Sequence, residues 1–196
     1  MGLGVKVSNG SPAVRLTHPT PMRHFGDMAP PVRIGISQCL LGDNVRYDGA
    51  HKRDDFLLEA LSRHVEWVPV CPEVELGLGT PREPMRLVGD PRAPRLITIT
   101  SKTDHTEAMA RFSQQRVREL EALNLSGYVF KADSPSCGIG EGPLETGLFA
   151  QAFMAHFPLI PVEEESRLHD PQALKSFLER ALAYRQSRIT FDQAGG

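Results

Sequence analysis

Cysteine is scarce in this sequence, and its three cysteines do not fit a disulfide-based fold. Cys39, Cys71 and Cys137 are widely separated and odd in number within 196 residues. Small secreted scaffolds instead carry even sets of closely spaced cysteines. The first residues also hold no apolar run of ~7 residues, which a secretory signal would require. We therefore expect free thiols in a reducing compartment, with the cytoplasm as the location.

Long hydrophobic runs and an excess of one charge are also missing. No stretch approaches the ~18 uncharged apolar residues that cross a bilayer, so no membrane partner is expected. The formal net charge of −2 provides no global basic field for nucleic acid. Hydrophobic residues make up 40% and charged residues 23%, as in ordinary globular domains. No pattern indicates an oligomeric state.

The first 31 residues differ in composition from the rest of the chain. They are rich in Gly, Pro and Ser and show no helix or strand period. We predict a disordered or loosely attached extension over residues 1–31, with Met22 or Met28 as an alternative start. A single α/β domain is expected over residues 32–190, followed by a tail at 191–196.

From Val32 onward, segments with strand composition alternate with segments of helical period. The predicted strands are 32–38, 65–70, 95–101, 127–133 and 159–164, and the predicted helices lie within 54–65, 104–124, 146–157 and 170–186. This alternation predicts an α/β fold with an open, mostly parallel, Rossmann-like sheet of about five strands and helices on both faces. The stretch 76–94 contains four prolines and is predicted to be a long binding loop.

The three cysteines share one position in the predicted fold. Each lies at or just beyond the C-terminal end of a predicted strand: Cys39 after 32–38, Cys71 after 65–70 and Cys137 after 127–133. In an open parallel sheet these ends lie along one edge, where ligands bind. The cysteines can therefore meet at one site.

Three interpretations of such a site remain open. The thiols are buried apolar side chains, or one is a nucleophile, or all three are ligands of zinc or an iron-sulfur cluster. The sequence shows no Cys-His-Asp arrangement, which disfavours the nucleophile. Three thiolates leave a tetrahedral zinc or a cubane one ligand short, and that position is either filled by a histidine or open to substrate.

Three segments carry a resemblance to a known family. They are CLLGDNVRYDG (39–49), VCPEVELGLGTPREP (70–84) and KADSPSCG (131–138). In this order they resemble the signature blocks of the TudS-like thiouracil desulfidases, long catalogued as a domain of unknown function, and the resemblance covers roughly residues 32–165. It implies that Cys39, Cys71 and Cys137 hold a [4Fe-4S] cluster with one iron not bound by protein.

The resemblance implies a non-redox hydrolysis of a thiolated uracil to the oxo base and hydrosulfide. A soft, exposed iron would polarise the C=S bond, and water would attack the carbon. Glu73 is the first choice of general base and Glu75 the second. Glu73 lies two residues after Cys71, and residues two apart in an extended segment face the same way, so the two can share one face of the site. Ser134 and Ser136 are predicted to donate hydrogen bonds in the site.

Charged residues of the same segments are candidates for substrate binding. They are Arg46, Asp48, Arg82 and Lys131, with Arg86 nearby. Each has a structural alternative as an ion-pair member, as the serines have in turn formation around Pro135. His51 is predicted to be a loop residue rather than a ligand.

Two further segments bear on the substrate. Residues 85–99 and 149–171 resemble the subgroup in which this domain is fused to a second one and acts on thiolated tRNA uridines. No second domain follows here, so a free thiolated base or nucleoside is favoured over tRNA. The alternative function is a zinc- or cluster-bearing binding or structural module without catalysis.

Overall fold

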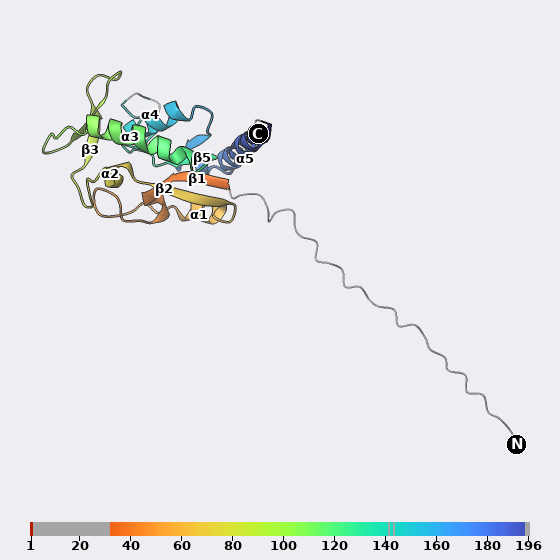
Figure 1. Ribbon diagram of the computed structural model, residues 1–196. Helices are drawn as coiled ribbons and strands as arrows, with labels where there is room; N and C mark the ends of the chain where they lie inside the picture. The colour runs from red at the N-terminus through yellow and green to blue at the C-terminus, as the bar shows by residue number, and fades with distance from the viewer. Residues whose placement is uncertain (2–31, 141, 143, 195–196) are drawn as a thin grey trace. The chain divides into compact units, whose positions relative to one another are not determined.

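A parallel β-sheet of four strands forms the centre of the fold, in the order β2-β1-β5-β6 (Figure 1). The strands are β1 (Val32–Ser37), β2 (Val65–Val70), β5 (Gly127–Phe130) and β6 (Val162–Glu164). The computed structural model describes Met1 and residues 32–140, 142 and 144–194. Apart from Met1, the predicted N-terminal extension lies outside these residues.

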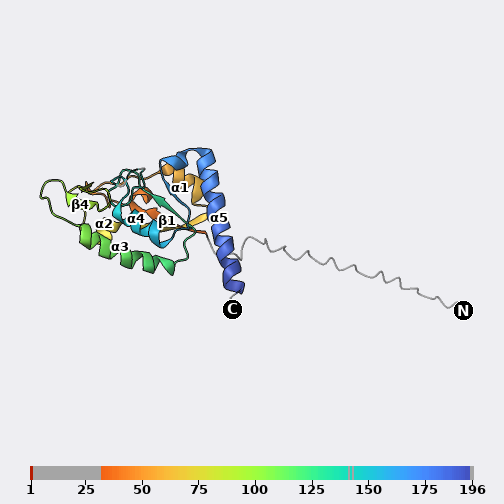
Figure 2. The same cartoon turned by 90° about the horizontal axis from the view of Figure 1, so that it is seen from above.

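Helices cover both faces of this sheet (Figure 2). One face packs against α1 (Asp55–Leu61) and α5 (Pro171–Ala194), and the other against α3 (Thr106–Glu121) and α4 (Leu148–His156). Short elements complete the chain: η1 (Gln38–Leu41), α2 (Pro72–Glu75) and η2 (Arg167–His169). The predicted α/β class, with helices on both faces of a parallel sheet, is confirmed.

Local sequence explains where the main elements begin. All four residues of β5 are buried, as the continuous apolar run GYVF requires in a strand covered on both faces. The side chain of Asp54 caps α1 by accepting from the Leu57 N–H at 3.0 Å. The carboxylate of Asp170 accepts from the Gln172 N–H at 2.9 Å at the start of α5. None of the described helices has the length and apolar character needed to cross a membrane.

The predicted strand at 95–101 does not join the main sheet. It forms β4 (Arg95–Thr98), which pairs antiparallel with β3 (Met85–Val88) in a separate sheet of two strands. The main sheet therefore has four strands rather than about five, and the prediction of an unbroken loop over 76–94 is wrong at 85–88. The Gly- and Pro-rich residues 89–94 allow a local hairpin, whereas a parallel strand needs a long crossover.

Candidate active site

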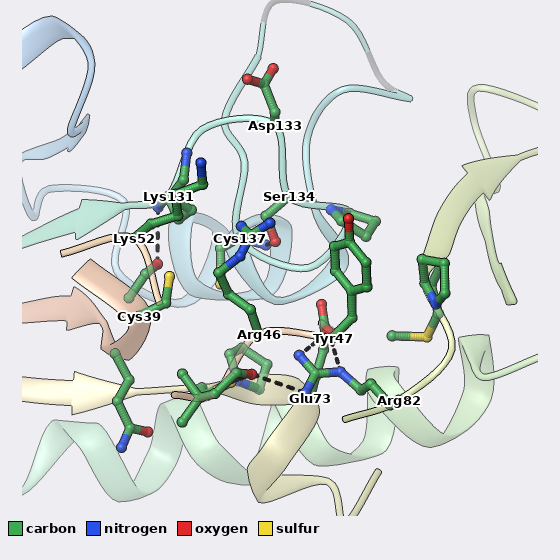
Figure 3. Close-up of a pocket in the computed structure, with 18 of the residues that line it drawn as sticks. Cys39, Arg46, Tyr47, Lys52, Glu73, Arg82, Lys131, Asp133, Ser134 and Cys137 are labelled. Atoms are coloured by element: carbon green, nitrogen blue, oxygen red, sulfur yellow. Dashed lines mark hydrogen bonds and ion pairs between the residues drawn. The ribbon is translucent and has the colours of Figure 1, made fainter. Parts of the chain in front are cut away.

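All three cysteines lie around one pocket at the C-terminal edge of the sheet. Cys39 lies in η1 after β1, Cys71 immediately precedes α2 after β2, and Cys137 lies in the loop that follows β5. They line a single pocket of about 480 Å³ and carry free thiols. Figure 3 shows Cys39 and Cys137 on the wall of this pocket.

Burial keeps these thiols protonated when no cation is bound. Burial, followed by the neighbouring Cys71, raises the pKa of Cys39 to about 11. Burial also raises the pKa of Cys71 and, to a greater extent, that of Cys137. Thiolate is the form that ligates metals, so these side chains need a soft cation to ionise.

The three cysteines line one pocket but are not grouped as the ligands of a single metal ion. Within the described part of the chain, no three His, Cys, Asp or Glu side chains lie close enough to share one metal ion. Three soft thiol donors that line one pocket fit a polynuclear cluster, in which separate iron atoms each take one thiolate. The donor set therefore fits the cofactor that the resemblance implies.

Glu73 is fixed at the pocket by two partners. The turn from β2 into α2, with Pro72 at the first helical position, places it two residues after Cys71. Its Oε2 accepts from Nε of Arg82 at 2.7 Å, and Nη2 of the same guanidinium lies 2.5 Å away. Its Oε1 accepts from the hydroxyl of Ser136 at 2.8 Å. The carboxylate is therefore held in one orientation against the pocket.

Arg82 is engaged by the protein at every side-chain nitrogen. Besides its pair with Glu73, its Nη1 donates to the carbonyls of Val45 at 2.9 Å and Gly79 at 2.8 Å. Its side chain is only 7% exposed. These contacts hold Glu73 and the segment at Val45 in place, and Arg82 also lines the pocket, so its predicted contact with substrate stays a prediction.

Arg46 lines the pocket as a partly buried cation. Its Nη2 lies 3.3 Å from Oδ2 of Asp48, whose pKa is lowered first by the Ala50 N–H and then by Arg46. Its Nε is buried and has no hydrogen-bond partner among the described residues. The guanidinium also lies 5.4 Å from the ring centre of Tyr47, a pocket residue (Figure 3). Arg46 is therefore held at the pocket wall by Asp48 and Tyr47.

Lys131 also lines the pocket, and Glu165 holds its side chain in position. Its Nζ lies 2.5 Å from Oε1 of Glu165 and donates to the Ala132 carbonyl at 2.9 Å. Oε2 of Glu165 accepts from the Ala132 N–H at 2.7 Å. Glu165 is 8% exposed, so this pair anchors the end of β5 to the segment that follows β6.

The two predicted serines have different environments. Ser134 lines the pocket, and its hydroxyl oxygen accepts from the N–H groups of Ser136 at 3.3 Å and Cys137 at 3.1 Å. This contact shapes the turn that presents Cys137. Ser136 is fully buried and donates to Glu73.

Three other residues considered in the sequence do not line this pocket. Glu75 accepts from the Cys71 N–H at 3.0 Å and pairs with Arg116 at 2.7 Å, so it caps α2 instead of facing the pocket. Arg86 lies on β3 and lines a neighbouring pocket. His51 is an exposed loop residue whose Nδ1 accepts from the Arg53 N–H at 3.2 Å.

Sequence inspection missed several pocket residues. Ser37, Tyr47, Lys52 and Asp133 all line the pocket. Ser37 is the last residue of β1, so the strand-end argument applied to the cysteines would have found it. Tyr47 stands in a turn, where periodicity gives no information about direction.

Comparison with known proteins identifies the family. A family model described as 2-thiouracil desulfurase matches residues 34–165. The chain belongs to the 2-thiouracil desulfurase family. The matched range contains every candidate site residue named above, and the resemblance found in the three sequence segments is confirmed.

Two individual proteins are similar to this family member. One is the uncharacterized protein YbbK of Bacillus subtilis (strain 168), which is 31% identical over 110 residues, covering 54% of this chain and 72% of YbbK. The other is a solved structure of the [4Fe-4S]-dependent thiouracil desulfidase TudS. It is 31% identical, with a TM-score of 0.59, and the match covers 74% of this chain and 96% of that chain.

Proposed function

We propose that this protein is a [4Fe-4S]-dependent desulfidase that hydrolyses the C=S bond of a thiolated uracil or thiouridine-type substrate. The observation that carries this proposal is the arrangement of three free cysteines, two of them buried and Cys39 half-buried, around a pocket that also presents Glu73. Cys39, Cys71 and Cys137 would hold the cluster. When bound, the cluster would supply a soft iron without a protein ligand that polarises the thiocarbonyl as a Lewis acid.

Glu73 is the proposed general base. An ionised carboxylate has about four lone-pair sites, so the contacts with Arg82 and Ser136 leave room to accept a proton from water. The water oxygen bonds to the ring carbon, the C–S bond breaks, and sulfur leaves as hydrosulfide. The reaction consumes one water and produces the oxo base, and no electrons are gained or lost.

Arg46 and Lys131 are the proposed substrate-binding groups. The guanidinium of Arg46 is suited to a carbonyl oxygen of the pyrimidine, and Asp48 restrains it. Arg82 acts as a positioning residue for Glu73. Ser134 shapes the turn that carries Cys137. A free base or nucleoside is the favoured substrate, and thiolated tRNA is the less favoured one.

Anaerobic reconstitution with iron and sulfide tests this function. The expected product is a brown protein that converts 2-thiouracil to uracil, while the same chain loaded with zinc is colourless and inactive. A cluster-loaded protein with no turnover on thiolated bases or nucleosides would support the structural module instead.

A further inference from the structure

Part of the pocket lining is apolar and has no role in the proposed chemistry. Tyr47, Pro84, Met85 and Ile99 line the same pocket as the three cysteines. Tyr47 and Ile99 are each 42% exposed, although both are large hydrophobic side chains. Scattered exposed apolar residues need no explanation, but apolar residues gathered in a pocket with a few polar groups are typical of a surface that a ligand covers.

The backbone of Tyr47 is held in place while its ring stays accessible. The Tyr47 carbonyl accepts from the Arg82 N–H at 2.8 Å, and the Gly49 N–H donates to the Arg46 carbonyl at 3.0 Å to close the turn. The guanidinium of Arg46 lies 5.4 Å from the ring centre, near the ~6 Å limit of a cation–π contact. Figure 3 shows the ring extending into the pocket beside Arg46. The ring is therefore positioned before any ligand binds.

The hairpin of β3 and β4 supplies the rest of the apolar lining. Met85 begins β3, and the N–H of Ile99, just after β4, donates to the Pro84 carbonyl at 2.9 Å. The carboxylate of Glu83 accepts from the Ser101 N–H at 2.7 Å. These contacts fix the end of the hairpin that borders the pocket. A preorganised apolar lining suits a rigid, flat ligand, because little freedom is lost when it binds.

We propose that Tyr47 is a specificity-determining residue, whose ring stacks on the pyrimidine ring of the thiolated substrate and so selects aromatic thiocarbonyl compounds. The inference rests on the proposed function, because it takes a thiolated uracil as the substrate. Offset stacking of a base on an aromatic side chain is favourable whatever groups the base carries. A thiocarbonyl on a saturated ring has no flat π-face for this contact. Tyr47 therefore contributes to the choice of substrate, and the cysteines and Glu73 do not depend on it.

The test compares two probes that differ in ring flatness. One is 2-thiouracil, and the other is 5,6-dihydro-2-thiouracil, which keeps the thiocarbonyl and the carbonyl but has a saturated, puckered edge. The KM for 2-thiouracil and the competitive inhibition constant of the dihydro compound are measured on reconstituted wild type and Tyr47→Leu. Wild type should prefer the aromatic probe by about tenfold, and Tyr47→Leu should lose this preference through a higher KM at nearly unchanged kcat.

Two further variants separate stacking from a general effect on the fold. Phe56→Leu on α1 is the matched control, because Phe56 is 45% exposed and lies outside the pocket lining, so it should keep the wild-type preference. Tyr47→Phe keeps the ring and should keep the preference too. A preference that survives in Tyr47→Leu, or one that is lost in Tyr47→Phe, would overturn the inference. A cluster-loaded wild type without turnover on thiolated bases or nucleosides would instead remove the proposed function and the inference together.

Discussion

At the scale of single residues, the charged side chains of the pocket occur as pairs. The pairs are Glu73 with Arg82, Lys131 with Glu165, and Arg46 with Asp48. Burying an ion pair costs desolvation energy that its attraction often only offsets. The two buried pairs are therefore better explained by the geometry that they impose on Glu73 and Lys131 than by a contribution to stability.

Replacing the proposed base should separate chemistry from cofactor binding. Glu73→Gln keeps a side chain of the same shape and leaves the cysteines intact, so iron content should match wild type. Turnover should fall by ~10²–10⁴-fold, the usual contribution of general acid-base catalysis. Glu75→Gln is the matched control and should stay near wild-type turnover, because Glu75 lies outside the pocket lining. Near-normal activity of Glu73→Gln would show that another residue is the general base.

Cys39 should make the metal-free protein less stable at high pH. Its pKa is about 11 in the folded chain, above the ordinary value of 9.0. Between these values the unfolded chain releases the thiol proton while the folded chain keeps it, so the free energy of unfolding falls as pH rises. Denaturant titrations of metal-free protein from pH 8 to 11 should show a smaller fall in Cys39→Ser than in wild type. Identical pH profiles would contradict this placement of the thiol.

At the scale of elements, sequence pattern predicts the parts of the fold whose local signals agree with their final contacts. The apolar run GYVF gives β5, and the Asp170–Pro171 pair gives the start of α5. The segment 85–88 escaped prediction because four residues carry too little pattern, and its strand depends on pairing with β4. The same limit explains Ser37, whose place at the pocket depends on its contact with Lys131 from another strand.

The loop that carries Cys137 joins α4 at Gly147, where the fold leaves no space for a side chain. A Cβ on Gly147 would lie 2.2 Å from the carbonyl carbon of Ser136, whereas one on Gly142 would meet its nearest neighbour at an ordinary 3.4 Å. Gly147→Ala should therefore displace the loop and destabilise the fold by about 1–3 kcal/mol, as overpacking usually does. Thermal melting and iron content should both fall, and Gly142→Ala should change neither. Full iron content in Gly147→Ala would show that the loop adapts.

At the scale of the whole molecule, the proposed ligands link three strands of one sheet. Cys39, Cys71 and Cys137 follow β1, β2 and β5, which are adjacent and parallel. A cofactor bound to all three would favour the folded state, because the unfolded chain does not preserve the site. The molecule should therefore be more stable with the cluster than without it.

Removal of the cluster, or of any one ligand, tests this link. Chelation of iron should lower the melting temperature, and Cys39→Ser, Cys71→Ser and Cys137→Ser should each lower both iron content and melting temperature under anaerobic conditions. Serine is close to cysteine in size, so the fall reflects loss of a ligand more than loss of packing. Unchanged melting with full iron in any one variant would exclude that cysteine as a ligand.

The most direct test of hydrolytic desulfidation follows oxygen and sulfur in one reaction. Reconstituted protein is incubated anaerobically with 2-thiouracil in ¹⁸O-labelled water, without an electron donor, and uracil and sulfide are quantified by mass spectrometry and colorimetry. Hydrolysis predicts equal amounts of uracil and sulfide, with one labelled oxygen in each uracil formed. Unlabelled uracil, or turnover that requires a reductant, would contradict it.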